Sequence, residues 1–329
     1  MRSRRLIAVL CIASILCIFI ACTLGSTPME FSRVIAAFIG QSSPGDNIVV
    51  WDIRLPRALA AYVVGLSLGA SGAALQGLLR NPLAEPGVLG VTATSSLAAT
   101  FVLYYGFAAS SVYILPVSAI AGALAATALL AAAAIRIKSV VTLILLGVGL
   151  SSFSAAVMSL LLNLAPTPFS LSDMINWLLG SVANRSFEDL TTVMPFMAAG
   201  LAILIFSRRG LSALTLGEEA ASGVGLNLSR QRIAVVLGAG LATGASVALA
   251  GAIGFVGIVA PHLIRPFVAY DPARSLLPSA MLAGIILVIA DIGVRLLPTT
   301  TELKLGVVAA IIGAPAFVWI AVSRRVTYD

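Results

Sequence analysis

The ionisable residues inside apolar stretches are the places where this sequence could do chemistry. Asp291 and Arg295 stand four residues apart in one such stretch, so both side chains share a helix face and we predict an ion pair between them. His262 is the single histidine, and we expect a hydrogen-bonded structural residue there rather than a haem ligand. One histidine excludes zinc sites built on paired histidines, and we predict no metal site.

The lysines and cysteines exclude further chemistry. Only Lys138 and Lys304 are present, and neither follows a glycine, so the phosphate-binding GxxxxGK[ST] loop is absent. Cys11, Cys17 and Cys22 all fall in the first apolar stretch without CxxC spacing, which favours packing residues; a lipoprotein signal ending at Cys22 is the alternative. No GxSxG elbow or Ser/His/Asp set occurs. We therefore expect neither ATP hydrolysis nor covalent catalysis by this chain.

The composition identifies the solvent that surrounds the chain. Of 329 residues, 60% are apolar and 10% are charged, and the mean hydropathy is +1.07. Soluble and disordered proteins are excluded, because the first carry about 25% charged residues and the second need low hydrophobicity. The net charge of +7 indicates membrane topology rather than nucleic-acid binding, since aromatic and basic residues are not interleaved.

Hydropathy divides the sequence into ten apolar segments, of which 257–268 is too short to cross a bilayer alone. We therefore predict an all-α integral membrane fold of about ten transmembrane helices, forming one domain over 1–329. The segments are 6–26, 54–79, 88–107, 113–135, 140–164, 190–206, 230–250, 257–268, 275–297 and 303–323.

The basic residues orient these helices. If the N-terminus is cytoplasmic, six of the 20 Lys and Arg residues fall outside and the remaining 14 inside, in agreement with the positive-inside rule. We expect both termini to be cytoplasmic. The six outside residues are Arg33, Arg54, Arg57, Arg185, Arg295 and Lys304.

An internal repeat accompanies this layout. The stretch GLSLGASGA at 65–73 recurs as GLATGASVA at 240–248, with six of nine positions identical. The copies lie in the second and the seventh segments, five places apart, so they run in opposite directions, as in the inverted repeats of transporters. We expect repeat halves of roughly 54–164 and 230–323. The glycines Gly65, Gly69, Gly240 and Gly244 are predicted to be helix-packing residues, because the GxxxG spacing lets two backbones approach closely.

Three stretches resemble a known family. They are RLPRALAAYVVGLSLGASGAALQGLLRNPLAEPGVLGV at 54–91, SVALAGAIGFVGIVAPHLIRP at 246–266 and ELKLGVVAAIIGAPAFVW at 302–319. The chain resembles the permeases of type II ABC importers for iron-siderophores, haem and cobalamin, at lower density over nearly its whole length. NPLAEPG and Pro261-His262 are the specific signals.

The resemblance implies an ATP-driven importer in the bacterial inner membrane. Its expected parts are a homodimer of this chain, two cytoplasmic ATPase subunits and a periplasmic binding protein that delivers a metal chelate. ATP and Mg belong to the ATPase subunits, and no cofactor is expected on this chain. Iron-siderophore, haem and cobalamin remain alternative cargoes.

The resemblance also assigns the cytoplasmic segment 207–229 to ATPase coupling. A short helix bounded by glycines is expected there, although an amphipathic loop on the membrane surface is the alternative. The predicted coupling residues are Gly217, Glu218, Glu219, Ala220, Gly223 and Gly225.

By the same resemblance, Arg54, Arg57 and Arg295 bind acidic residues of the binding protein, because the planar guanidinium can hold a carboxylate with two hydrogen bonds. Snorkelling and topology anchoring are the alternative roles. The predicted gate and path residues are Asn81, Leu83, Ser139 and Thr142, with helix-ending turn formation as the alternative role for Asn81.

Two functions from other classes remain open at this point. A stand-alone secondary transporter or channel would move its solute without ATP, but such a carrier usually buries more carboxylates or histidines than this sequence offers. A membrane-embedded enzyme lacks its catalytic residues.

Overall fold

The computed structural model describes residues 2–25, 27–136, 139–297 and 302–323, and that part of the chain contains helices and no strand. All ten predicted segments contain a helix. Among the described residues, seven helices are long and apolar enough to span a bilayer. The all-α fold is therefore confirmed. The helices are α1 (Arg2–Thr23), α4 (Leu55–Leu78), α5 (Val91–Tyr104), α6 (Ile114–Arg136), α7 (Val140–Asn163), α9 (Phe187–Ala213), α11 (Leu228–Ala250), α12 (Val256–Ile264), α13 (Pro272–Leu296) and α14 (Leu305–Ser323).

Shorter helices join these long ones. They are α2 (Phe31–Phe38), α3 (Pro44–Asn47) and α8 (Pro168–Leu178), the six-residue α10 (Glu218–Gly223), the π-helix η1 (Ile48–Arg54), and the 3₁₀ turns η2 (Pro86–Leu89), η3 (Phe107–Ser110), η4 (Leu214–Leu216) and η5 (Arg265–Val268). Because η1 runs directly into α4, one helical rod extends over Pro44–Leu78. In α8, Thr167 caps the first turn by accepting a hydrogen bond from Ser170 N, and Pro168 occupies the position where a missing N–H costs nothing.

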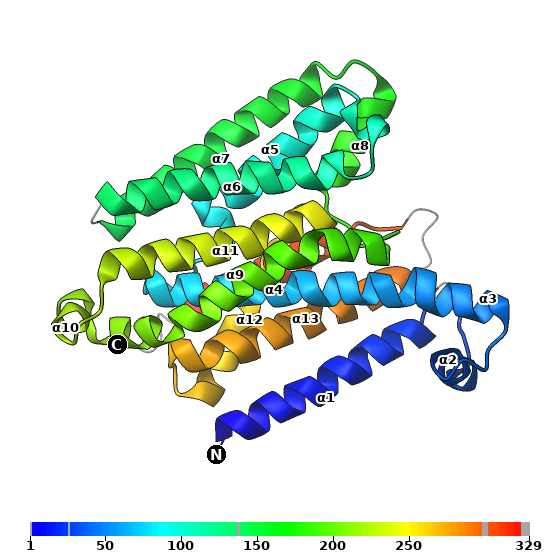
Figure 1. Cartoon of the computed structure of the whole chain (residues 1–329), viewed down its shortest axis with the longest axis horizontal. Helices are drawn as coiled ribbons and strands as arrows, with labels where there is room; N and C mark the ends of the chain where they lie inside the picture. The colour runs from blue at the N-terminus through cyan, green and yellow to red at the C-terminus, as the bar shows by residue number, and fades with distance from the viewer. Residues whose placement is uncertain (1, 26, 137–138, 298–301, 324–329) are drawn as a thin grey trace.

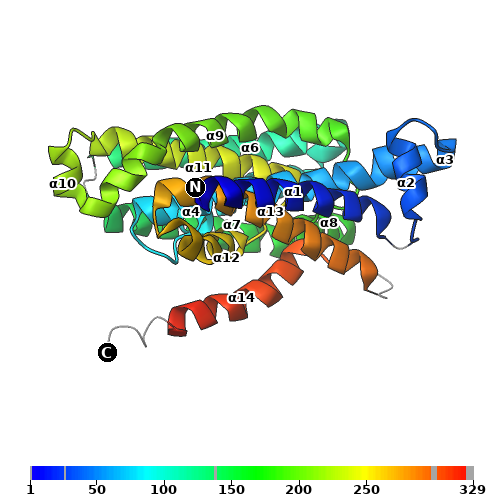
Figure 2. The same ribbon diagram turned by 90° about the horizontal axis from the view of Figure 1, so that it is seen from below.

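The helices form an elongated bundle with two distinct ends (Figure 1). We call one the α3 end, where α2, α3 and α8 lie, and the other the α10 end. The N-terminal end of α1 lies at the α10 end. In Figure 2, α14 runs out from the body of the bundle toward the α10 end.

The core of the bundle is built from α4, α11 and α13. In α4 and α11, 78% of the residues in the most apolar stretch are buried, against 17% in α7. Much of the buried surface is Ala, Gly and Ser, which lets the helix backbones approach closely. The long helices therefore divide into interior ones, above all α4 and α11, and rim ones such as α7.

The predicted packing glycines lie in two tight seams. Gly65 and Gly69 of α4 face α13, where a Cβ added at Gly69 would lie 2.6 Å from the carbonyl oxygen of Ser279. Gly240 and Gly244 of α11 face α6. Helices α4 and α11 run in opposite directions (Figure 1). In each half, the first helix of the repeat thus packs against the third helix of the other half, which is the arrangement that an inverted repeat produces.

Candidate functional site

The α3 end contains a buried cluster of charges centred on Asp291. The carboxylate of Asp291 is 1% exposed and accepts hydrogen bonds of 3.0 and 2.7 Å at Oδ1 from Nε and Nη2 of Arg57. Nε of Arg295 lies 3.1 Å from Oδ2 of the same carboxylate, so the predicted ion pair of Asp291 and Arg295 is confirmed. Arg57 also pairs with Glu302. The cluster contains more charges than the two residues that the sequence indicated.

Arg54 and Arg295 of this cluster bind the end of α1. Nη1 of Arg54 donates two hydrogen bonds of 2.9 Å, and Nη1 of Arg295 donates two of 3.0 and 3.1 Å, while Nη2 of Arg54 donates a further one. Carbonyls at the end of a helix have no intrahelical N–H partner, so a cation that binds them stabilises the helix end. The accepting carbonyls belong to Ala21, Cys22, Thr23, Leu24 and Thr27.

The three arginines share one cavity of about 230 Å³, which Glu302 also lines. Arg54 and Arg57 are only 6% and 9% exposed, because their guanidinium groups turn toward α1 and α13. Their assignment to one end of the bundle therefore agrees with the structure, but their partners within the chain were not visible in the sequence. Binding of an acidic partner by these arginines stays a prediction.

The opposite end presents the predicted coupling segment as a projection. Gly217 and Gly225 have φ angles of 99° and 91°, which residues with a Cβ rarely adopt, and they bound α10 on either side. Within α10, Ala221 is fully buried, whereas Glu219 and Ala220 are exposed. Gly223 is the last residue of α10 and is also exposed.

One ion pair fixes this projection to the bundle. Nη2 of Arg232, in α11, donates a hydrogen bond of 2.7 Å to Oε1 of Glu218. The side chain of Arg232 is 8% exposed and that of Glu218 is 41% exposed. Next to the helix, Leu216 and Val224 are 66% and 70% exposed. The segment therefore combines a firm attachment with a mixed apolar and acidic outer surface.

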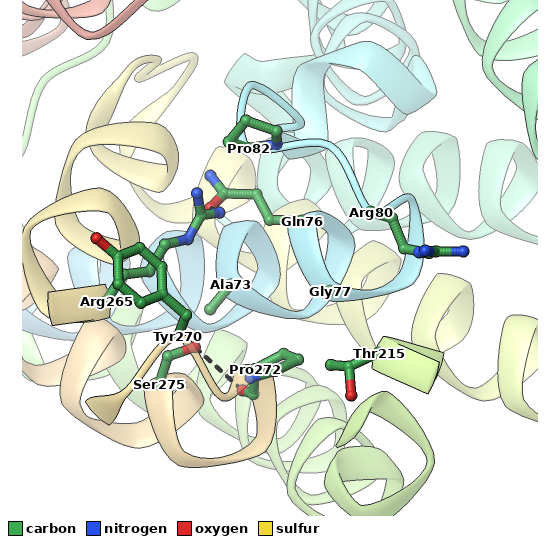
Figure 3. Close-up of a pocket in the computed structure, with 10 residues that line it drawn as sticks. All are labelled: Ala73, Gln76, Gly77, Arg80, Pro82, Thr215, Arg265, Tyr270, Pro272 and Ser275. Carbon is green, nitrogen blue, oxygen red and sulfur yellow. Dashed lines mark hydrogen bonds between the residues drawn. The ribbon is translucent and has the colours of Figure 1, made fainter. Parts of the chain in front are cut away.

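A cavity of about 300 Å³ lies beside this segment, at the end of α4 (Figure 3). The guanidinium of Arg265 reaches toward Gln76 and donates to its Oε1, whereas the side chain of Arg80 points away. Nε2 of Gln76 donates to the carbonyls of Ala84 and Gly257 at 3.2 and 3.4 Å. Gln76 thus joins the two repeat halves at the cavity wall.

The predicted gate residues lie at the α10 end but have local partners. Oδ1 of Asn81 accepts a hydrogen bond of 2.9 Å from Leu83 N, which closes the turn after α4. Oγ of Ser139 accepts one of 3.3 Å from Thr142 N and thereby caps α7, and both residues are exposed. Further along α7, Oγ of Ser151 donates at 3.3 Å to the carbonyl of Gly87. A role of the predicted gate residues Asn81, Leu83, Ser139 and Thr142 in a gate stays a prediction.

Glu85 is a site residue that sequence reasoning missed. Its Oε2 accepts a hydrogen bond of 3.2 Å from Phe255 N, directly before α12 begins. Phe255 has a φ of 67°, in the region that non-glycine residues rarely occupy. The carboxylate therefore caps a short helix that starts inside the bundle. The NPLAEPG motif contained this residue, but its partner is 170 positions away.

Comparison with known proteins shows the family to which the chain belongs. The sequence profile of the FecCD transport family matches residues 12–323. A siderophore transport system permease protein named YfiZ, from Bacillus subtilis (strain 168), is 37% identical over 302 residues, covering 90% of this chain and 89% of the relative. The vitamin B12 import system permease protein BtuC of Vibrio cholerae serotype O1 is 40% identical over 280 residues, covering 84% and 83%.

A solved structure shares the fold. Described as a metal-chelate type ABC transporter in an inward-facing conformation, it superposes with a TM-score of 0.87 at 29% sequence identity, covering 97% of this chain and 99% of the other. The expected fold, the membrane-spanning helices and these relatives agree with one another. The chain belongs to the FecCD transport family and is a multi-pass membrane permease of the metal-chelate type of ABC importer.

Proposed function

We propose that this chain is the membrane subunit of an ATP-driven importer that receives a metal chelate from a binding protein. Two copies of the chain and two ATPase subunits would form the complex, with ATP and Mg bound by the ATPase subunits and no cofactor on this chain. The observation that carries the proposal is α10, held between Gly217 and Gly225 as an exposed projection. The family and the named relatives support the same function.

In this proposal α10 transmits the ATPase cycle to the helices. Glu218 ties it to Arg232 of α11, and α11 packs through Gly240 and Gly244 on α6. A force on the projection would therefore act on an interior helix rather than on a loose loop. Because these small-residue seams allow little deformation and join the two repeat halves, we expect each copy of the chain to move as a block between two arrangements of similar free energy.

The proposed orientation places α10 in the cytoplasm and the α3 end outside the bacterial inner membrane. The basic residues of the sequence support this, since those predicted to lie inside include Arg80, Arg136 and Arg232, and those predicted outside include Arg57 and Arg295. Both termini are then cytoplasmic. We assign the exposed rim helix α7 and the outlying α14 to the contact with the second copy of the chain. The transport path would then run between the two copies.

Binding-protein docking belongs at the α3 end in this proposal. Arg54, Arg57 and Arg295 line its cavity, and Glu302 is the partly exposed carboxylate among their partners. An acidic side chain of the binding protein would replace Glu302 on Arg57. Asp291 would stay in place, because it is almost fully buried.

Copurification tests the proposal. We expect an ATPase subunit to copurify with the native chain and the purified complex to need a binding protein and ATP for uptake into proteoliposomes. Changing both Glu218 and Glu219 to Arg reverses the charge of the projection and breaks the hydrogen bond between Glu218 and Arg232, a charged contact worth about 1.5–3 kcal/mol. Transport should then fall at least about tenfold. The same reversal at Glu30, an exposed carboxylate of the other end, is the control and should leave transport unchanged.

The opposite outcome identifies the competing function. Sustained uphill uptake by the purified chain alone, driven by an ion gradient and indifferent to ATP, would show a stand-alone secondary transporter. Passive flux without ATP would show a channel. For the cargo, titration of the cognate binding protein with a ferric siderophore, haem and cobalamin distinguishes the three classes that the family carries.

A further inference from the structure

A second cavity at the α3 end lies apart from the Asp291 cluster. Its volume is about 260 Å³. It is enclosed by α8, the connection from α8 to α9, the adjoining ends of α5, α6 and α11, and the residue that precedes α14. The charged groups that line it are Asp173, Arg185 and Lys304, together with the polar side chains of Asn176 and Trp177.

Arg185 and Trp177 offer donors that nothing within the described chain accepts. The guanidinium carbon of Arg185 lies 5.9 Å from the centre of the Trp177 ring, a cation–π contact that holds both side chains at the cavity wall. Nε of Arg185 and Nε1 of Trp177 are buried, and neither has a hydrogen-bond partner among the residues that the structure describes. Trp177 as a whole is 9% exposed. Buried donors are normally paired, so this arrangement favours an acceptor from outside the chain.

The charge of the cavity indicates what kind of acceptor fits. Arg185 and Lys304 are cations, and Asp173 is the one carboxylate among the lining residues. Burial lowers the pKa of the Arg185 guanidinium, and the charge of Asp189 partly opposes this shift. Arginine nevertheless remains protonated in proteins, and its fork accommodates a carboxylate with two parallel hydrogen bonds. The volume suits the end of a side chain rather than a whole chelate.

The arginines of the neighbouring cluster make the contrast. Arg57 and Arg295 already contact Asp291, and Arg54 already binds three backbone carbonyls. An acidic partner must displace an internal group to reach Arg57, whereas the Arg185 guanidinium has no ion pair or hydrogen bond with any residue that the structure describes. The Arg185 cavity is thus ready to receive a carboxylate.

From these observations we infer that the cavity formed by Arg185, Trp177 and Lys304 receives an acidic side chain of the binding protein that delivers the cargo. The inference rests on the proposed function, because it requires such a partner at the α3 end. Its position supports that occupant, since Lys304 of this cavity stands two residues from Glu302 of the arginine cluster, so that both sites lie at the same end of the bundle. The binding protein would first engage Arg185 and then exchange with Glu302.

The test is a titration of the binding protein against the permease–ATPase complex in lipid nanodiscs. Arg185→Gln removes the charge and the planar guanidinium with its paired N–H donors, but keeps a side chain that can cover the Trp177 ring. A charge-assisted contact that is lost corresponds to an affinity about tenfold weaker. Arg33→Gln is the matched control, because Arg33 is another α3-end arginine, with a half-exposed side chain that already pairs with Asp46 of the same chain. We expect its affinity to stay within about twofold of native.

Two further variants separate charge from geometry. Arg185→Lys keeps the charge but loses the fork, so its affinity should lie between those of the native chain and Arg185→Gln. Trp177→Phe keeps a ring and removes the Nε1 donor, and it should weaken binding about threefold. If Arg185→Gln does not assemble with the ATPase subunits, Trp177→Phe alone decides the inference.

The outcomes distinguish this inference from the proposed function. Native-like affinity in an assembled Arg185→Gln complex, or in Trp177→Phe where that variant decides, would overturn the inference while leaving the proposed function intact. A native complex that binds no binding protein would overturn both. A loss confined to cargo-loaded binding protein would assign the cavity to a carboxylate of the cargo, and would also overturn the inference.

Discussion

The two ends of the bundle use charge in opposite ways. At the α3 end, Asp291 is buried between Arg57 and Arg295, and these arginines also bind Glu302 and the end of α1. At the α10 end, the ion pair between Glu218 and Arg232 holds a short exposed helix to the bundle. The first end therefore joins α1, α4, α13 and the segment before α14 around one carboxylate, whereas the second presents an exposed acidic helix.

This difference between the two ends indicates which end resists motion. Removing one partner from a buried ion cluster leaves an uncompensated charge, which is far more costly than the loss of a surface pair. The α3 end should consequently behave as a rigid frame and the α10 end as the part that partners can move. In the proposed importer this matches a frame that receives the binding protein and a projection that responds to ATP.

The largest expected effect is on the buried cluster itself. Asp291→Ala leaves Arg57 and Arg295 buried without their shared carboxylate, so we expect the free energy of unfolding to fall by about 3–5 kcal/mol. Thermal unfolding of the purified complex in detergent measures this. Glu218→Ala at the other end is the comparison and should cost less, about 1.5–3 kcal/mol, because the partner Arg232 is buried but the carboxylate of Glu218 is 41% exposed. Equal losses in the two variants would remove the contrast between the ends.

The next largest effect concerns the tight seam between α4 and α13. Gly69→Ala places a Cβ 2.5 Å from the Cβ of Ala283 and 2.6 Å from the carbonyl oxygen of Ser279, so α4 and α13 must separate. Overpacking of this kind costs about 1–3 kcal/mol. Gly293→Ala is the control, since a Cβ at this exposed glycine of α13 has no neighbour within 4 Å.

The two glycine variants should differ in the direction in which they change the melting temperature. Helix propensity favours Ala over Gly by about 1 kcal/mol, so Gly293→Ala should be neutral or stabilising. A melting temperature for Gly69→Ala at or above that of the native chain would show that the interior seam is not tight.

How far the sequence predicts this architecture depends on the range of the interactions involved. The ten helices could be predicted, because bilayer thickness requires about 20 apolar residues in a row. The pair of Asp291 and Arg295 could be predicted from a spacing of four. The short helices α2 and α8 were missed, because neither is long enough to stand out in hydropathy.

Long-range partners were beyond the sequence. Glu302 is 245 positions from Arg57, and no local pattern connects them. The same holds for Glu85 and Phe255 and for the cavity between Arg185 and Lys304. The sequence could thus place Arg54, Arg57 and Arg295 at one end of the bundle, while the groups that hold them had to come from the fold.

The smallest expected effect tests how the two sites at the α3 end cooperate. Glu302→Gln removes the partly exposed carboxylate from Arg57 and leaves Asp291 in place. Because the side chain of Glu302 is 40% exposed, its pair with Arg57 is worth at most about 1 kcal/mol. If an acidic side chain of the binding protein must displace Glu302, the variant should bind that protein more tightly, by no more than about fivefold. Raising the salt concentration should shrink the gain, since the partner contact is electrostatic. Affinity that falls instead would mean that Glu302 holds Arg57 in the orientation that docking needs, and that the cluster is a fixed frame on which the binding protein rests without exchange.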